Sequence, residues 1–564
     1  MINQIKIVTG FLVLSTVRSE VPDSLIINIA QGPVRGYLED NLHIFYNIPY
    51  ATAPKGVDKF KAPLDPPFWT ETFNAINNNI ICPQMQSIIL DQPFNEDCLV
   101  ANVFVPNTNA TNLPVVVMVH GGAYMAGNGN TMTPKELVKS GRIIAVTFNY
   151  RLGVHGFLCL GTDKAPGNAG MKDQIALLHW IKKNIHSFGG NPDDVTIAGH
   201  SAGASAVDLL LLSDMAKGLF NKVIAESGAN VGVWSMQLDP LQIAKDYASY
   251  QGFDNIEDIT ALEDFYTSAS WEDLIDIIQS ALNTDSSFAF VPCVERNIGQ
   301  ELFLSDAPST IMQEGRFEKY PMLYGFSELE GEFRAGLFDD WKIAMNEKFT
   351  DFLPSDLHFE TTDERELVAQ EVKEFYFGNL NVTDETVRAY IDYFSDVGFA
   401  YGMLRSVQLQ VKAGNDKIFL YEYRFDGEEF NPIIARLNIR GAGHSYQTYI
   451  ILDFLNAILP ILSNRTTEMA NIMRDLWLNF IINGVPTHDG LTNAWLPVSG
   501  ALRSPHMALD LPPAARGPLL QRRAEFWDSI YEKYYRAPRA PGAAPSLRFQ
   551  LILIAFGVLT AIVK

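Results

Sequence analysis

The stretch "VTIAGHSAGAS", residues 195–205, decides the fold of this chain. The apolar, β-branched run at 195–198 predicts a buried strand, and "SAGASAVDLLLL" at 201–212 predicts a helix whose first turn is made of small residues. About 0.2 Gly-x-Ser-x-Gly patterns are expected by chance in a chain of this length, so the letters alone are weak evidence. The pattern gains a mechanical meaning where a strand turns sharply into a helix and holds the serine hydroxyl clear of the backbone. That context is present here, and it makes Ser201 a candidate nucleophile.

The segments around this stretch alternate between strand and helix patterns. Near-continuous apolar runs at 113–122 ("LPVVVMVHGG") and 142–151 ("RIIAVTFNYR") are typical of strands buried on both faces. Apolar residues recur at helical spacing across 167–185. The pattern predicts an α/β fold with a large, mainly parallel sheet covered by helices on both faces. Residues 240–410 are helix-rich and more charged, and "KIFLYEYRF" at 417–425 predicts a return to the sheet.

The composition is that of a soluble globular protein. Of 564 residues, 47% are hydrophobic and 19% are charged, which is enough apolar material for a sizeable core. The formal net charge of −22 argues against a nucleic-acid partner, because binding phosphate backbones requires clustered Lys and Arg. We therefore expect a solvated acidic surface around an ordinary core.

Both ends of the chain resemble processing signals. Residues 1–19 carry one lysine and a short apolar run, which predicts a secretory signal peptide, with a first core strand as the alternative. We expect one folded domain over 20–535 and a linker over 536–548. The hydrophobic tail at 549–564 has an apolar part shorter than the roughly 20 residues of a spanning helix. Small residues at 542–544 make it a candidate glycolipid-anchor (GPI) signal, with a short membrane tail or a functionless extension as alternatives.

Export makes the four cysteines informative. Four cysteines allow three complete pairings, and spacing alone does not choose among them. Cys82 and Cys98 enclose a 15-residue loop without secondary-structure periodicity, which a disulfide would stabilise. Cys159 and Cys293 both have apolar neighbours, so we expect them to be buried free thiols.

Three Asn-x-Ser/Thr sequons agree with an exported protein. They lie at Asn109, Asn381 and Asn464 and are candidate glycosylation sites. Together with the N-terminal pattern they predict a secreted or extracellular glycoprotein, attached to the membrane if the tail at 549–564 acts as an anchor.

A nucleophilic serine requires a base and an acid that orients it. On a strand–turn–helix serine fold these partners follow the serine in the order acid, then histidine. Unaided, the sequence favours His444 only mildly, because "GAGHS" places it in a flexible turn, and 65 carboxylates leave the acid open. The histidines that follow any plausible acid are His358, His444, His488 and His506.

The segment "VMVHGGAY" ends a predicted strand at Gly121 and Gly122. Without side chains, the N–H groups of two glycines can approach a substrate oxygen and stabilise developing negative charge. A lone Gly-Gly more often marks a tight turn. Combined with the strand–turn–helix around Ser201, the pair becomes a candidate oxyanion hole.

Several motifs together resemble the type-B carboxylesterase and cholinesterase family over residues 24–535. The family is an α/β-hydrolase, and the resemblance implies hydrolysis of small carboxylic esters, with the helix-rich region contributing to an active-site gorge and without metal or cofactor. The matching segments are "NIPYA" (47–51), "NEDCLVANVF" (95–104), "HGGAY" (120–124), "NYRLGVHGFL" (149–158), "GNAGMKDQIALLHW" (167–180) and "FGGNPDDVTIAGHSAG" (188–203).

The resemblance also selects the partners of Ser201. The family's acid lies in a Gly-x-x-x-x-Glu-Gly segment, matched by "GFSELEG", which selects Glu330 over Glu328 and Glu332. The family's histidine lies in a Gly-x-x-His turn, matched by "GAGH", which selects His444. The resemblance thus implies a catalytic triad of serine, glutamate and histidine.

Further roles are implied by the same resemblance. The oxyanion donors are the backbone N–H groups of Gly121, Gly122 and Ala202. Ser227 in "AESGAN" matches a family serine that supports the acid. Cys82 is expected to pair with Cys98.

Departures from the family pattern narrow the range of substrates that we expect. The loop between Cys82 and Cys98 has no tryptophan, and His200 stands where cholinesterases have a glutamate, so two cation-binding elements are missing. Juvenile hormone esterases usually have glutamine at the position of His200. The chain is most similar to general carboxylesterases such as the insect enzymes that hydrolyse odorant, hormone-like or xenobiotic esters. We expect neutral, largely apolar esters, with His200 either touching substrate or packing beside the turn.

Alternatives to that reading are a juvenile hormone esterase-like enzyme and a non-catalytic adhesion protein of the neuroligin kind, which keeps the fold and loses the catalytic residues. All three triad positions are filled in this chain, at Ser201, Glu330 and His444. The sequence therefore favours an enzyme over a binding protein.

Overall fold

The computed structural model describes seven stretches of the chain: 24–85, 93–276, 283–427, 437–454, 462–488, 495–499 and 505–542. The predicted signal peptide (1–19), the tail (549–564) and the second part of the predicted linker (536–548) lie outside the described residues. In the described part, no helix is both long and apolar enough to cross a membrane.

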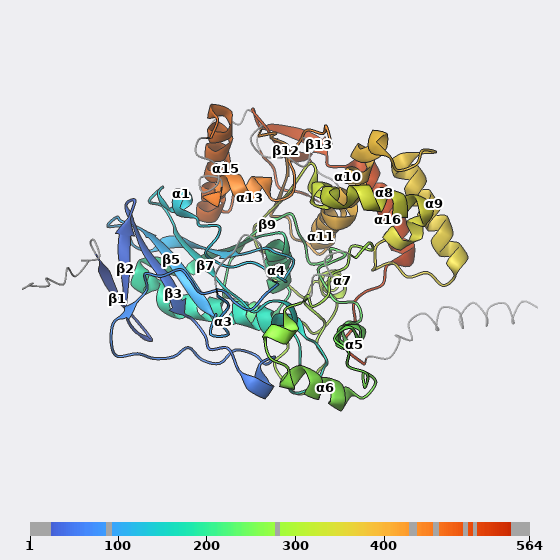
Figure 1. Ribbon diagram of the computed structural model, residues 1–564. Coiled ribbons are helices and arrows are strands. Elements are labelled where there is room, and N and C mark those ends of the chain that lie inside the picture. Colours follow the sequence, from blue (N-terminus) through green and yellow to red (C-terminus); the bar gives the residue numbers. More distant parts are fainter. Residues whose placement is uncertain are drawn as a thin grey trace, which may run out of the picture.

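One 13-stranded sheet forms the centre of the molecule (Figure 1). Its order is β1-β2-β3-β5-β7-β6-β8-β9-β10-β11-β12-β13, with β4 paired to β2. Neighbours from β7 through β12 pair in parallel, and the other neighbours in this order pair antiparallel, while β4 is parallel to β2. The strands are β1 (Leu25–Ile29), β2 (Gly32–Glu39), β3 (Leu42–Pro49), β4 (Phe73–Asn74), β5 (Val100–Pro106), β6 (Leu113–Val119), β7 (Ile144–Phe148), β8 (Gly190–His200), β9 (Lys222–Glu226), β10 (Met322–Ser327), β11 (Ile418–Tyr423), β12 (Pro505–Leu509) and β13 (Ala514–Pro518).

Helices cover both faces of this sheet, as strand β6 shows. Alternate side chains of a strand point to opposite faces. Val115 and Val117 belong to the core that includes α3 and α4, whereas Val116 and Met118 belong to the core that includes α13 and α15. The α/β architecture with a large, mainly parallel sheet is confirmed. The helices are α1 (Lys135–Val138), α2 (Gly153–Phe157), α3 (Ala169–Asn184), α4 (Ala202–Leu210), α5 (Pro240–Tyr250), α6 (Ile259–Ser268), α7 (Pro308–Gln313), α8 (Phe338–Glu347), α9 (Thr362–Phe377), α10 (Val387–Ser395), α11 (Tyr401–Lys412), α13 (Tyr446–Ile451), α15 (Asn464–Asn483) and α16 (Gln521–Tyr534).

Several helices begin where a polar side chain accepts hydrogen bonds from the first turn. Asp258 caps α6, Thr361 caps α9 and Ser463 caps α15. Such a side chain satisfies an amide that has no partner within the helix. These caps fix the residue at which each of the three helices begins.

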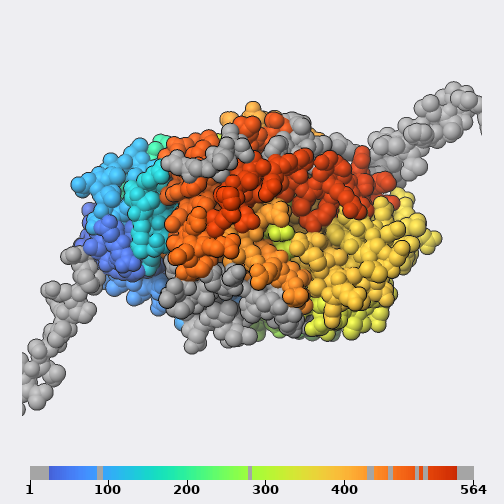
Figure 2. All heavy atoms as spheres, turned by 90° about the horizontal axis from the view of Figure 1, so that it is seen from above, coloured from blue at the N-terminus to red at the C-terminus, as the bar shows by residue number. Residues whose placement is uncertain are grey.

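The helix-rich region forms one end of the molecule. Helices α8 to α10 gather with α16 at one end, and the N-terminal strands β1 to β3 lie at the other (Figure 1). The view from above shows the same separation between the blue N-terminal part and the yellow helical part (Figure 2). Segments on both sides of this division meet where β6, β8 and β10 end, which is where the candidate residues lie.

The structure corrects the prediction for two cysteines. Cys159 and Cys293 form a disulfide with a Cα–Cα distance of 6.8 Å, and are not free thiols. Asn168 holds their segments together, because its side chain donates to the carbonyl of Cys293 and accepts from its amide, at 2.8 and 2.9 Å. Apolar neighbours suit a buried disulfide as well as a buried thiol, so the sequence pattern did not reveal a pair separated by 134 residues.

Candidate functional site

Ser201 lies at the turn between β8 and α4, in a backbone conformation that is rare for a residue with a side chain. Its φ is +54° and its ψ is −125°. Such conformations persist only where the surroundings enforce them. Here two glycines allow the turn: a Cβ on Gly199 would lie 2.2 Å from the carbonyl oxygen of Gly203, and a Cβ on Gly203 would lie 2.1 Å from that of Val119. The small residues of the sequence pattern therefore let α4 pack directly against the strand ends.

The structure brings Ser201, His444 and Glu330 into one hydrogen-bonded series. The Nδ1 atom of His444 lies 2.5 Å from Oε2 of Glu330, and its Nε2 atom lies 3.1 Å from Oγ of Ser201. A carboxylate only accepts hydrogen bonds, so Nδ1 carries the proton and Nε2 is free to accept from the serine hydroxyl. This is the geometry that general-base activation of a serine requires.

The other candidate histidines lie elsewhere. His358 is exposed, His488 is paired with Asp475, and His506 hydrogen-bonds to the carbonyl of Gly517. Of the four, all of which the structure describes, His444 alone has a hydrogen bond to Ser201.

The neighbours of Glu330 separate it from the two other glutamates of its motif. Glu330 begins a 3₁₀ helix three residues after the last residue of β10 and is fully buried. It accepts hydrogen bonds from the hydroxyl of Ser227 and, at 2.7 Å, from the amide of Ser327. Glu328 instead forms an ion pair with Arg388 at the surface. A buried carboxylate held by these donors is well placed to orient an imidazole.

Gln447 completes this part of the site, and no sequence pattern pointed to it. Its side chain donates to Oγ of Ser227 and accepts from Oγ of Ser327, both at 2.5 Å. It therefore connects the two residues that donate to Glu330. Gln447 belongs to α13, which begins two residues after His444.

The loop that carries Gly121 and Gly122, called the glycine loop below, lies directly beside the turn at Ser201. A Cβ on Gly121 would lie 3.0 Å from the Cβ of Ser201, so only a glycine lets the loop approach this closely. The ring of His120 is partly buried, stacks on Tyr150 with ring centroids 4.3 Å apart, and donates to the carbonyl of Gly121. Burial lowers the pKa of His120 to about 4, so its ring is neutral at pH 7. Holding that carbonyl turns the next amide, of Gly122, in the opposite direction, because the peptide is planar and trans.

Ala202 provides the third predicted donor. It is the first residue of α4, where an amide has no partner within the helix and the helix dipole favours negative charge. The structure thus places the amides of Gly121, Gly122 and Ala202 at two adjacent strand ends, those of β6 and β8.

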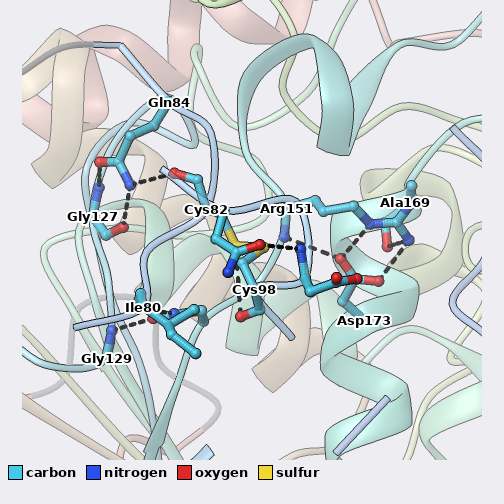
Figure 3. The surroundings of a disulfide bond; sticks show 12 residues. Ile80, Cys82, Gln84, Cys98, Gly127, Gly129, Arg151, Ala169 and Asp173 are labelled. Carbon is cyan, nitrogen blue, oxygen red and sulfur yellow. Dashed lines mark hydrogen bonds and ion pairs between the residues drawn. A yellow bond between two sulfur atoms is a disulfide. The ribbon is translucent and has the colours of Figure 1, made fainter. Parts of the chain in front are cut away.

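A disulfide stabilises the glycine loop through a neighbouring residue. Cys82 and Cys98 are bonded, with a Cα–Cα distance of 5.0 Å, which is the pairing that the resemblance implied. Gln84, beside Cys82, donates to the carbonyl of Gly127 at 3.0 Å and accepts from its amide at 2.9 Å (Figure 3). The short disulfide loop therefore holds the segment that follows Gly121 and Gly122.

His200 packs beside the turn. It is 9% exposed and lies opposite Glu226 in the register of β8 with β9. Burial lowers its pKa to about 3, with smaller contributions from His444 and His120, so it is neutral at pH 7. His200 and Glu226 line a small cavity of about 30 Å³ together with Thr448. A cavity of this size has room for ordered water but not for an ester substrate.

Aromatic rings pack beside the imidazole of His444. The ring of Phe399 lies 4.5 Å from that of His444, centroid to centroid, and the ring of Phe333 lies 5.7 Å from it. Trp234 packs against both Phe399 and Phe288. Phe333 is 44% exposed, so this wall is partly open to solvent. Most of these residues come from the helix-rich region, whose sequence gave no indication of which side chains would reach the histidine.

The three sequon asparagines, Asn109, Asn381 and Asn464, are all exposed. Each is therefore accessible to modification, which is what a glycosylation site requires.

Comparisons with known proteins identify the family of this chain. A sequence model described as "Carboxylesterase family" matches residues 23–527. The juvenile hormone esterase of Heliothis virescens is 32% identical over 501 residues, covering 82% of this chain and 86% of the relative. Esterase E4 of Myzus persicae is 31% identical over 504 residues, covering 85% of this chain and 88% of the relative.

A solved structure gives the same result. The crystal structure of juvenile hormone esterase from Manduca sexta, with OTFP covalently attached, superposes with a TM-score of 0.80 at 28% sequence identity. The similarity covers 90% of this chain and 100% of that one. The two proteins therefore share one fold along nearly their whole length.

Proposed function

This chain belongs to the carboxylesterase family and is a carboxylesterase, and we propose that Ser201 is its nucleophile, His444 its general base and Glu330 the acid that orients the base. The observation that carries the assignment is the hydrogen-bonded series from Ser201 through His444 to Glu330. Ser227 and Gln447 hold the acid in this series.

The reaction follows from these positions. The oxygen of Ser201 attacks the ester carbonyl carbon while Nε2 of His444 takes the hydroxyl proton, and Glu330 stabilises the resulting imidazolium. The tetrahedral intermediate collapses when its bond to the alkoxy group breaks, and His444 returns the proton to the leaving alcohol. A water molecule, deprotonated by His444, then attacks the acyl-enzyme. The acid leaves, and the proton returns to Ser201.

The negative oxygen of each tetrahedral intermediate requires donors. We assign this role to the amides of Gly121, Gly122 and Ala202. The closeness of Gly121 to Ser201 and the position of Ala202 at the start of α4 support the assignment. Donors of this kind act only on charge that develops during the reaction, so they lower the barrier rather than strengthen substrate binding.

We infer that the substrates are uncharged and largely apolar esters. The wall beside His444 is formed by Phe333, Phe399, Trp234 and Phe288, whose rings offer apolar area. His200 is neutral at pH 7 and supplies no negative charge for a quaternary ammonium group. Odorant-like, hormone-like and xenobiotic esters all meet this description, and choline esters do not.

A juvenile hormone-type ester is a second candidate. The names of two relatives, from Heliothis virescens and Manduca sexta, support it. His200, in place of the usual glutamine, counts against it. Hydrolysis of a long-chain methyl ester, compared with short-chain p-nitrophenyl esters, separates the two: a kcat/KM at least about 100-fold higher for the methyl ester would favour the hormone-type substrate.

The test of the catalytic assignment is Ser201→Ala, assayed on p-nitrophenyl acetate and butyrate. We expect kcat/KM to fall by at least about 10⁴-fold, because the remaining site has no nucleophile for the base to activate. Ser213→Ala is the matched control, since Ser213 is also buried and lies outside the site, and it should retain the parent activity. If Ser201→Ala hydrolyses both esters as fast as the parent, the assignment is wrong.

We also infer that the protein is exported. Two disulfides support this, because such bonds persist in oxidising compartments, and so do the three exposed sequons. Attachment through the tail at 549–564 is tested by treating intact cells with a phosphatidylinositol-specific phospholipase. Release of esterase activity would support the anchor, and retention would contradict it.

A further inference from the structure

Two consecutive residues at the end of β9 contact all three segments that carry the proposed triad. The carbonyl of Glu226 accepts from the amide of Ser201 at 2.8 Å. The hydroxyl of Ser227 donates to Glu330. The carboxylate of Glu226 accepts from the hydroxyl of Thr448, on the helix that follows His444, at 2.6 Å. Ser227 was predicted to support the acid, but nothing in the sequence indicated a role for Glu226.

We propose that Glu226 is a positioning residue that sets the distance between Ser201 and His444 by holding the turn of one through its main chain and the helix of the other through its carboxylate. This inference rests on the proposed function, since it concerns the same triad. Glu226 itself has no contact with the reacting atoms.

The carboxylate is held in one orientation. Its Oε1 atom accepts from the hydroxyl of Tyr421, at 2.5 Å, and from the indole of Trp477, at 3.0 Å. Tyr421 belongs to β11 and Trp477 to α15, two elements of the surrounding framework. Glu226 is fully buried, so bulk solvent does not compete for these bonds. Oε2 is left to accept from Thr448, and the direction of that bond follows from the other two.

Thr448 connects this carboxylate to the histidine. It lies in α13 (Tyr446–Ile451), which begins two residues after His444. Between them, the amides of Thr448 and Tyr449 both donate to the carbonyl of Ser445, at 3.0 Å, so the first turn of the helix is continuous with the histidine loop. A change in the position of Thr448 therefore moves the backbone that carries His444.

The turn at Ser201 is in close backbone contact with the end of β9. The ladder between β8 and β9 sets His200 opposite Glu226, and the amide of Ser201 continues it. A Cβ on Gly228 would lie 2.3 Å from the carbonyl oxygen of Ser201, so the segment after β9 is also in close contact with the turn. Ser201 is thus fixed relative to Glu226 by backbone contacts, whereas the helix that follows His444 is joined to the Glu226 carboxylate by a side-chain hydrogen bond, that of Thr448.

The charges around Glu226 fit this role. The groups that face it are His200 on β8, Tyr421 and Tyr423 on β11, and Glu330, whose negative charge raises the pKa of Glu226. Burial is the largest cause of the rise, to about 7. No cation is among them, so three hydrogen-bond donors stabilise the carboxylate in place of an ion pair.

The test compares two substitutions at Thr448 in the full-length protein. Thr448→Val removes the hydroxyl at nearly constant volume, and Thr448→Ser keeps it. We expect Thr448→Val to lower kcat about 10-fold with KM within about twofold, because a small displacement of His444 affects the transition state more than substrate binding. Thr448→Ser should retain kcat within about threefold. Equal kcat values for the two variants would overturn the proposal.

A double-mutant cycle with Glu226→Gln adds a second criterion. If Glu226 acts through Thr448, adding Glu226→Gln to Thr448→Val should lower kcat by less than about twofold further. Independent, multiplying effects would overturn the proposal. Should Glu226→Gln fail to fold, the comparison of valine with serine at position 448 still decides.

Two controls separate the possible failures. Thr267→Val, on α6, also removes a buried threonine hydroxyl that donates to a carbonyl, that of Glu263, and should leave kcat unchanged. Ser201→Ala in the same series tests the proposed function. If it stays active, the triad assignment fails, and if it is inactive while Thr448→Val equals the parent, only the positioning role fails.

Discussion

The serine side and the histidine side of the site are held by different kinds of contact. Ser201 and Gly121 end two neighbouring strands, β8 and β6, and their positions follow from backbone pairing and from glycines that leave no room for a Cβ. Glu330 and His444 lie 114 residues apart. One backbone bridge, between Leu329 and Gly443, joins their segments, and hydrogen bonds of side chains orient the two groups. In the first arrangement each turn is specified by its own short motif, whereas the second depends on side chains from segments far apart in the sequence.

The two disulfides offer the largest test of this difference. Cys82–Cys98 closes 16 residues beside the glycine loop, and Cys159–Cys293 closes 134 residues between distant segments. Loop-closure entropy predicts that losing the long-range bond costs about 5 kcal/mol of stability and losing the short one about 3 kcal/mol. The Tm of Cys159→Ala/Cys293→Ala should therefore fall further than that of Cys82→Ala/Cys98→Ala.

The loss of activity in the two cysteine double variants should follow the opposite order to the loss of stability. The short disulfide positions Gln84 against Gly127, next to the proposed oxyanion donors (Figure 3). Measured well below both Tm values, kcat should fall more in Cys82→Ala/Cys98→Ala than in the other double variant. Equal losses of Tm, or a larger loss of kcat on removing Cys159–Cys293, would contradict the division into local and long-range contacts.

The same division explains what the sequence predicted. The strands at β6 and β7 and helix α3 were predicted because their apolar patterns are local. The antiparallel strand β1 was not, since it is short and its side chains alternate between partly buried and exposed. Within the site, Ser201, Gly121 and Gly122 were identified from their own motifs.

The remaining residues depend on contacts that no local pattern records. Glu330 and His444 were selected only through a family resemblance. Gln447 lies 220 residues from Ser227, and Thr448 lies 222 residues from Glu226, so neither pair was visible before the fold was known. The partner of Cys159 was missed for the same reason.

A further prediction concerns the pH dependence of stability that Glu226 causes on the histidine side of the site. Burial raises the pKa of Glu226 to about 7 in the folded protein, above its ordinary 4.5. Its proton is bound more tightly in the folded state, so its contribution to stability is present below about pH 4.5 and is lost as pH rises through about 7. A shift of this size corresponds to about 3 kcal/mol. The Tm of the parent minus that of Glu226→Gln should therefore decrease from pH 5 to pH 8.

The comparison with the variant isolates this effect. Burial lowers the pKa of His120 and His200, and these give the opposite trend, a loss of stability as pH falls below about 6.5, in both proteins alike. Asp356→Asn is a matched control, since burial raises the pKa of that carboxyl to about 6 and the decrease should centre about one unit lower. A difference in Tm that stays constant from pH 5 to pH 8 would show that Glu226 keeps the same charge in the folded and unfolded states.

The smallest expected effect is that of Gly203→Ala, on the serine side of the site. Alanine is favoured over glycine within a helix by about 1 kcal/mol, so helix propensity alone predicts a gain in stability. The added Cβ, however, would lie 2.1 Å from the carbonyl oxygen of Val119, which is backbone and unable to rotate away, so α4 must move from the strand end. A displacement of about 1 Å at Ser201 should lower kcat/KM about 100-fold. Gly336→Ala, where a Cβ meets nothing within 4 Å, should leave kcat/KM unchanged. Parent activity in Gly203→Ala would mean that the turn tolerates displacement and that the serine side is not set by backbone packing.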